Sequence, residues 1–176
     1  MIELRPLQRE DLALLRSWLD EPLVRRWWAD DSSAEAVEAQ YGPSVDGTDP
    51  TRVWVVLEDD APVGMVQGYR WDDEPGETAA MASVWPVPAG ALSVDYLLGS
   101  PAVRGRGIGP QLVRAAVAEL RGLHPDARDV VVPVHAENRR SWRALEKAGF
   151  TRVARGELEP DHPADSRDHV VYRLEL

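Results

Sequence analysis

Cysteine is absent from the 176-residue sequence. This absence excludes disulfide bonds, thiolate metal sites and a cysteine nucleophile. No apolar run approaches the roughly 18 residues that a membrane span requires. The opening residues, Met1 to Pro6, lack the basic and apolar regions of a secretory signal. We therefore expect a cytoplasmic protein that has no membrane association, and we predict no metal site.

Basic charge is also scarce. The chain has 20 lysines and arginines against 30 aspartates and glutamates, for a net charge of −10. Nucleic acid is a poor partner for such a surface, because phosphate neutralisation dominates its binding. A small cationic substrate fits better, since acidic walls attract cations. An acidic excess that only maintains solubility is the alternative.

Phenylalanine occurs once, whereas tryptophan occurs seven times. Three tryptophans fall in periodic segments and are expected in the core: Trp18, Trp54 and Trp142. The other four lie beside polar or acidic loop residues: Trp27, Trp28, Trp71 and Trp85. Flat aromatic faces beside carboxylates suit a sugar-like polycation. Packing at the edge of the core explains any one of these four equally well.

Hydrophobic periodicity predicts alternating strands and helices in a single domain over residues 1–176, of the α/β or α+β class. Its length is enough to bury one core. The expected strands are 2–5, 53–58, 63–71, 92–98, 129–134, 151–158 and 169–176. The expected helices are 9–20, ended by Pro22, then 32–41, 109–121 and one that begins at Asn138. Residues 42–51, 72–90 and 159–168 are expected to be loops, and the last two are acidic.

A glycine-rich turn, Pro101 to Pro110, lies between a predicted strand and a predicted helix. Glycines let backbone amides converge on an anion, and a helix N-terminus adds partial positive charge. Arg104 and Arg106 are expected to add full charges at the rim. The dinucleotide fingerprint and the Walker A loop are both absent, because Leu112 takes the sixth position and no Gly-Lys-Ser/Thr follows. The turn predicts a pyrophosphate seat, with an incidental surface turn as the alternative.

The segment Arg104-Gly-Arg-Gly107-Ile-Gly109 resembles the Arg/Gln-x-x-Gly-x-Gly/Ala loop of the GNAT superfamily of N-acetyltransferases. A second segment, Asn138 to Phe150, resembles the later motif of that family, Asn-x-x-Ala-x-x-x-Tyr-x-Lys-x-Gly-Phe. The predicted element order also matches the family over the whole chain. The resemblance implies a central mixed, mostly antiparallel sheet that is splayed between its fourth and fifth strands and flanked by helices.

The same resemblance implies acetyl-coenzyme A as the cofactor. Leu97 and Leu98 would supply backbone groups to its pantetheine arm and its thioester oxygen, and the glycine loop would bind its pyrophosphate. Asn138 and Ser141 would approach from the other side of the splay. The implied cofactor residues are Leu97, Leu98, Val103, Arg104, Gly105, Arg106, Gly107, Ile108, Gly109, Pro110, Asn138 and Ser141.

Asp95 is the predicted catalytic residue. It interrupts an apolar strand, where a carboxylate is costly unless it has a partner. There it would hold the substrate ammonium and accept its proton, directly or through water. A strand aspartate facing solvent is the alternative.

The general acid is not assigned, because Leu145 stands where the family commonly has a tyrosine. Ser141, Tyr96, His135 and water remain candidates. Strand alternation places Tyr96 opposite Asp95, which disfavours it.

Several segments of the N-terminal half resemble the aminoglycoside 6′-N-acetyltransferases: 11–19, 24–28, 41–45, 62–69 and 94–98. This implies acetylation of the 6′-amine of an aminoglycoside by direct attack in a ternary complex, as an antibiotic-resistance enzyme. The implied substrate residues are Trp28, Gln67, Tyr69, Asp95 and His135. His135 also fits a loop histidine bonded to backbone. Pro133 stands where that subgroup can carry an aspartate, so Asp72, Asp73, Glu77 or Asp161 would have to compensate.

Other functions remain open at this point. A siderophore-type hydroxylysine N-acyltransferase shares the tryptophan pair but would more naturally carry basic residues for a carboxylate substrate. Another small-amine acetyltransferase, a protein N-terminal acetyltransferase with a peptide groove, and a non-catalytic coenzyme A-binding module are further alternatives. The assembly is expected to be a monomer or a homodimer.

Overall fold

The computed structural model describes residues 1–176 as one seven-stranded sheet with the order β1-β2-β3-β4-β5-β7-β6. Its strands are β1 Ile2–Pro6, β2 Arg52–Glu58, β3 Ala61–Arg70, β4 Leu92–Leu98, β5 Asp129–His135, β6 Thr151–Glu157 and β7 Asp168–Glu175. Only β4 and β5 run parallel, and all other neighbours are antiparallel. The predicted mixed, mostly antiparallel sheet is therefore confirmed.

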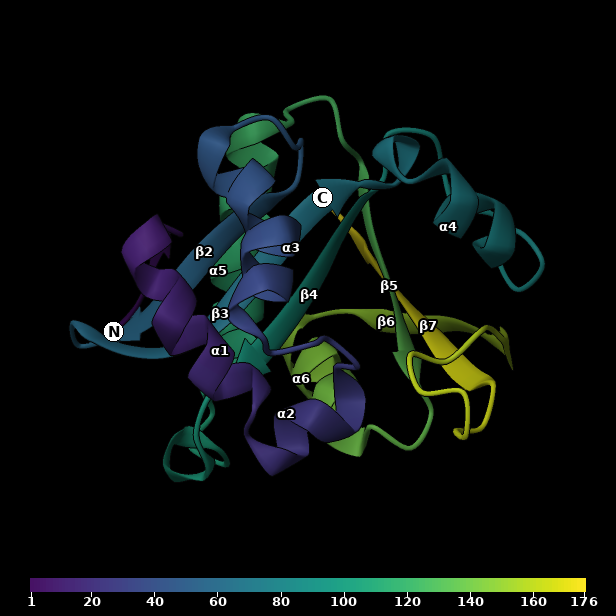
Figure 1. The fold of residues 1–176 in the computed structure, drawn as a ribbon. Coiled ribbons are helices and arrows are strands. Elements are labelled where there is room, and N and C mark those ends of the chain that lie inside the picture. Colours follow the sequence, from purple (N-terminus) through teal and green to yellow (C-terminus); the bar gives the residue numbers. More distant parts are fainter.

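The sheet splits between β4 and β5. These two strands share a single paired position, Leu92 with Val130, whereas β3 and β4 pair along their length. Figure 1 shows β4 and β5 diverging from that point, with α6 (Arg139–Ala148) in the gap. One edge of β4 beyond Leu92 therefore has no strand partner, and the predicted splay is confirmed.

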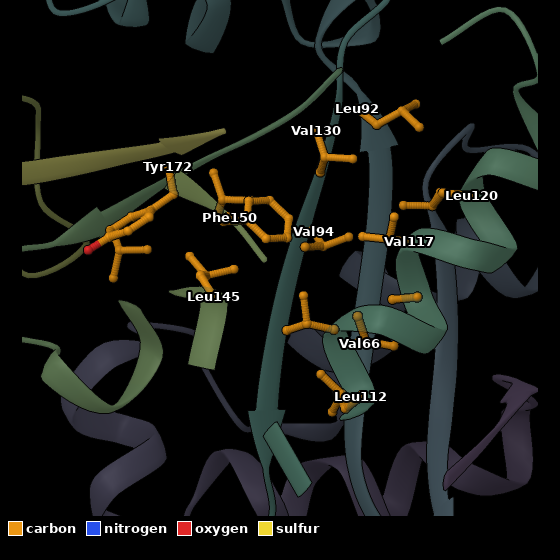
Figure 2. Packing of buried hydrophobic residues seen from close by; sticks show 14 of the residues in the cluster. Val66, Leu92, Val94, Leu112, Val117, Leu120, Val130, Leu145, Phe150 and Tyr172 are labelled. Carbon is orange, nitrogen blue, oxygen red and sulfur yellow. The ribbon is translucent and has the colours of Figure 1, made fainter. Parts of the chain in front are cut away.

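Helices cover both faces of the sheet, because each has one apolar stripe to bury. On one face α5 (Ile108–Leu123) packs Leu112, Val113 and Leu120 into a core with β-strand valines (Figure 2). On the other face lie α1 (Leu12–Leu19) and α3 (Ala34–Asp46), which bury apolar residues against β2, β3 and β4. None of the helices combines the length and the apolar character that crossing a bilayer requires.

The ends of α6 follow the predicted capping pattern. The Asn138 side chain accepts a hydrogen bond from the Ser141 amide at 3.3 Å, which satisfies one donor of the first turn. At the other end Gly149 has a φ of +109°, a left-handed conformation that glycine adopts without strain. Trp18 and Trp54 are buried in the core, as expected, and Trp142 is partly buried against it.

A short helix, α2 (Pro22–Trp27), was not predicted. Pro22 follows the end of α1, but it also begins α2, because proline is tolerated in the first turn where its missing N–H has no partner to lose. The Glu21 carboxylate caps this turn by accepting hydrogen bonds from the Leu23 and Val24 amides, each at 3.1 Å. This helix carries the tryptophan pair toward the splay.

Two predicted loops contain helix. Residues 42–46 belong to α3, which includes Pro43 and ends at Gly47. The acidic segment 72–90 contains the last two residues of the 3₁₀ turn η2 (Trp71–Asp73) and all of α4 (Pro75–Met81). The prediction was wrong here because Trp71 and Met81 are fully buried against β5 and β7, and the Trp71 indole donates to the Val131 carbonyl at 3.0 Å. Tertiary packing orders a segment whose composition indicated loop.

Candidate active site

A cavity of about 470 Å³ lies at the splay between β4 and β5. Its walls come from the strands β3, β4, β5 and β7, from the helices α2, α3, α4 and the start of α6, and from the segments before α3 and between β6 and β7. All five residues predicted to bind substrate line it: Trp28, Gln67, Tyr69, Asp95 and His135. The fold thus brings together side chains from distant parts of the sequence, as the resemblance implied.

Carboxylates supply most of the charged groups on the walls of this cavity. Six line it: Asp30, Glu77, Asp95, Glu159, Asp161 and Asp165. The one guanidinium, that of Arg26, is paired with Asp165 at 2.5 Å and with Glu137 at 3.6 Å. The remaining negative charge makes the cavity attractive to a cation.

Asp95 lies on β4 beside the split. Its carboxylate accepts a hydrogen bond from the Gln67 amide at 3.0 Å, across the β3–β4 pair. Burial raises the pKa of Asp95 to about 6, with the nearby Asp161 and Asp30 adding to the increase. A carboxyl with a pKa near neutrality suits a general base, because it takes up a proton readily while still ionised at neutral pH.

Asp30 and Asp161 approach the cavity from opposite sides of the split. Asp30 is oriented by the Tyr41 hydroxyl at 2.8 Å and the Gln40 amide at 3.0 Å. The pKa of Asp161 is raised by burial and by the charge of Asp30. Of the four acids that were expected to compensate for Pro133, Glu77 and Asp161 line the cavity, as does Pro133 itself, whereas Asp72 and Asp73 lie outside it.

Aromatic rings form another wall. Trp27 and Trp28 both line the cavity, and the ring of Trp27 lies 5.4 Å from that of His135, centroid to centroid. Nε2 of His135 lies 2.8 Å from the Ser166 carbonyl, and Nδ1 accepts the Glu137 amide at 3.2 Å. The interpretation of His135 as a histidine bonded to backbone is therefore confirmed, although its ring also faces the cavity.

The glycine-rich turn leaves five consecutive backbone amides, Gly105 to Gly109, without a hydrogen-bond acceptor in the protein. Gly105 and Gly107 have φ values of +76° and +82°, and a Cβ at either position would meet no atom within 4 Å. Successive free amides at the start of a helix as long as α5 form an anion-binding nest. The turn therefore leaves a row of backbone donors available to an anion.

The sequence position of Arg104 suggested a free charge at the rim of the turn, but its side chain is not free. Its guanidinium contacts the Glu21 carboxylate and donates to the Leu98 carbonyl at 3.0 Å. Only 15% of the side chain is exposed. Arg104 therefore fastens the end of β4 to the cap of α2. Arg106 is more exposed and pairs with Glu58 at 3.0 Å.

The other predicted cofactor residues surround the same end of the splay. Val103 ends the 3₁₀ turn η3 (Pro101–Val103), and Ile108 and Pro110 belong to the first turn of α5. A Cβ on Gly109 would lie 3.2 Å from that of Ala144, so α5 and α6 pack closely there. Four further predicted residues lie along the split: Leu97, Leu98, Asn138 and Ser141.

Sequence reasoning disfavoured Tyr96, yet it lines the cavity together with Asp95. Strand alternation does send the two side chains to opposite faces of β4. Both reach the cavity because β4 has no partner on this edge, so the cavity extends around it. Trp27 and Asp30 were also not assigned, since their approach depends on the unpredicted α2.

The fold and the site together define a class of protein: an acetyltransferase. The chain belongs to the acetyltransferase (GNAT) domain family, whose model matches residues 8–158.

The chain is 29% identical over 174 residues to an aminoglycoside N(6′)-acetyltransferase type 1 of Klebsiella pneumoniae, covering 93% of this chain and 80% of that protein. Among solved structures it resembles aminoglycoside acetyltransferase AAC(6′)-Ib in complex with coenzyme A and kanamycin, with a TM-score of 0.78 and 26% identity over 99% of this chain and 95% of the other. Spermidine N-acetyltransferase from Vibrio cholerae shares the fold, with a TM-score of 0.73 and 16% identity over 99% of this chain and 95% of the other.

Proposed function

We propose that this acetyltransferase transfers the acetyl group of acetyl-coenzyme A to the 6′-amine of an aminoglycoside. The observation that carries the proposal is the position of Asp95. Its carboxyl has a pKa of about 6 and faces an acidic, tryptophan-lined cavity at the split of the sheet. An aminoglycoside carries several ammonium groups on sugar rings, so both the charge and the aromatic wall suit it.

The chain offers a matching set of groups for coenzyme A. The unpaired amides of Gly105 to Gly109 fit a pyrophosphate, with the N-terminus of α5 adding partial positive charge. Leu97 and Leu98 would present backbone groups to the pantetheine arm along the unpartnered edge of β4. Asn138 and Ser141 would contact the same arm from α6. When bound, acetyl-coenzyme A supplies the activated acetyl group.

Asp95 would hold the ammonium group of the acceptor and take its proton, so that a neutral amine attacks the thioester. Gln67 fixes the carboxylate orientation through its 3.0 Å hydrogen bond. Direct attack within a ternary complex needs no covalent enzyme intermediate, in keeping with a chain that has no cysteine. Holding both reactants at one split contributes proximity, which is itself a large part of the rate.

The charge of the cavity separates this proposal from its alternatives. A hydroxylysine acceptor carries a carboxylate, yet the one guanidinium in the cavity is already paired with Asp165 and Glu137. A coenzyme A-binding module without catalysis would have no use for a cavity carboxyl whose pKa is raised to about 6. The acidic walls therefore favour a polycationic acceptor over both.

A matched pair of substrates tests the proposal. Neomycin and paromomycin differ at the 6′ position, where the first has an amine and the second a hydroxyl. We expect thiol release from acetyl-coenzyme A with neomycin and with kanamycin, and at least about 100-fold slower release with paromomycin, because a hydroxyl has no proton that Asp95 removes as readily. Equal rates on the pair would refute 6′ regiochemistry, and turnover only on spermidine or a peptide would refute the substrate class.

Asp30 tests the electrostatic part of the proposal. Asp30→Asn removes one carboxylate from the cavity wall and should raise KM for kanamycin about 10-fold, in the range of a lost charge-assisted hydrogen bond. Asp31→Asn is the matched control. Asp31 is exposed and lies outside the cavity, and its substitution removes the same charge. Steady-state kinetics in low and high salt measure both variants. Equal KM changes in the two would show that only net charge matters.

A further inference from the structure

Two hydroxyl groups meet across the split of the sheet. Tyr96 Oη, from β4, lies 2.9 Å from the carbonyl oxygen of Ser141 and 3.0 Å from its Oγ, in the first turn of α6. Both residues line the same cavity as Asp95. Asp95 and Tyr96 leave β4 on opposite faces, so a thioester held at this strand edge would have a carboxylate on one side and a phenol on the other.

This pair has a hydrogen-bond donor to spare. It carries two hydroxyl protons, and the Ser141 carbonyl takes one of them from Tyr96. The second proton runs between the two oxygens or points away from them, since a hydroxyl rotates to suit its neighbours. An anion that arrives beside Tyr96 therefore finds a donor without breaking the fold.

We propose that the Tyr96 phenol donates a hydrogen bond, and then the proton, to the sulfur of the departing coenzyme A, with Ser141 positioning the phenol. The inference rests on the proposed acetyl transfer. Burial raises the pKa of Tyr96 to about 12, so the phenol stays protonated at every pH at which the enzyme would work.

The step balances. The substrate ammonium gives one proton to Asp95, and the nitrogen lone pair then forms the bond to the carbonyl carbon. The C–S bond breaks, its electron pair leaves with the sulfur, and the sulfur takes the proton of Tyr96. The second proton of the nitrogen is released as the amide forms, and it replaces the proton that Tyr96 gave up.

The other candidate donors are engaged elsewhere or lie on the other face of the sheet. Tyr69 also lines the cavity, but strand alternation places it on the same face as Gln67 and Asp95. Leu145, at the position where the family motif has tyrosine, is fully buried beside Phe150 in the core (Figure 2). Both ring nitrogens of His135 are engaged with backbone. The Tyr41 hydroxyl donates to a carboxylate at 2.8 Å. The phenol that the family motif carries on the helix is thus replaced here by one on β4, the strand that faces α6.

The affinity for coenzyme A itself tests the proposal without any acceptor. A hydrogen bond to sulfur favours the thiolate, so calorimetric affinity for coenzyme A should rise about tenfold between pH 7 and pH 9.5, as its thiol ionises, whereas affinity for desulfo-coenzyme A should not. In Tyr96→Phe the rise should disappear, and kcat should fall about 10- to 100-fold with little change in KM. An unchanged rise in Tyr96→Phe would overturn the assignment.

Two further variants sharpen the result. Tyr172→Phe removes a phenol that bonds to Glu146 outside the cavity, so its pH series should match the wild type. Ser141→Ala keeps the carbonyl partner and should lower kcat only about two- to fivefold; a loss as large as that of Tyr96→Phe would assign the donor to Ser141 instead. A sulfur-dependent affinity with no aminoglycoside turnover would refute the proposed acceptor but support the assignment of Tyr96 as the donor to sulfur. Absence of coenzyme A binding would refute both.

Discussion

Asp95→Asn is expected to lower kcat/KM for kanamycin by about 10²- to 10⁴-fold, the range for a lost general base. Asparagine keeps the shape of the side chain and an oxygen that accepts the Gln67 hydrogen bond, so the loss reports on the proton and the charge. In the wild type, kcat/KM should rise with pH through about 6, where Asp95 ionises. Full activity in the variant, or a fall of its kcat/KM below pH 6 like that of the wild type, would show that Asp95 is not the general base.

The same substitution should stabilise the protein at neutral pH. The folded pKa of Asp95, about 6, lies above the ordinary value of about 3.9, so between these two values the folded state binds more protons than the unfolded state. The wild type therefore loses stability as pH rises from about 4 to 6, whereas the asparagine variant does not. Denaturant unfolding at pH 7.5 should show a gain on the order of 1–3 kcal/mol that vanishes near pH 4. A destabilised variant at pH 7.5 would contradict the burial of this carboxylate.

Gly107→Ala is expected to weaken coenzyme A binding by about 10- to 100-fold. Gly107 precedes α5 with a φ of +82°, where a residue with a Cβ costs about 1–2 kcal/mol. A turn that relaxes to avoid this cost misaligns the amides of the nest, and each hydrogen bond lost to a phosphate is worth about 1.5–3 kcal/mol. Since the added methyl group would meet no protein atom, the effect does not come from a clash.

Two controls separate this effect from general destabilisation. Acetyl-pantetheine lacks the pyrophosphate, so its affinity should be the same for Gly107→Ala and the wild type. Gly122 lies on the exposed side of α5 with open space around it. Gly122→Ala should therefore leave coenzyme A binding unchanged while stabilising the helix by about 0.5–1 kcal/mol. Tight binding of coenzyme A to Gly107→Ala would show that the turn does not hold the pyrophosphate.

Much of the site was predictable because its signals are local. The glycines of 105–109 indicate unpaired amides before a helix, Asn138 and Gly149 mark the ends of α6, and a carboxylate inside the apolar run of β4 singles out Asp95. Each signal lies within a few residues of the feature that it predicts. Backbone conformation and capping depend on near neighbours, so the sequence carries them directly.

The rest depends on partners far apart in the chain. The sequence position of Arg104 suggests a phosphate ligand, but its guanidinium is paired with Glu21, which lies 83 residues away in the chain. Arg26 and Asp165 meet across 139 residues and close one side of the cavity. Trp71 was expected at the end of a strand, beside an acidic loop, and its burial against β5 was not predicted because that strand follows about 60 residues later. Such pairings are set by packing, which no local pattern encodes.

By itself the sequence determined the order of the strands and of the longer helices, the glycine-rich turn before α5 and the carboxylate inside the apolar run of β4. The tertiary structure alone decided which acids surround that carboxylate and that Tyr96 shares its cavity. The physical reason is the split between β4 and β5: it frees one edge of a strand, and side chains that alternation sends to opposite faces then reach the same space.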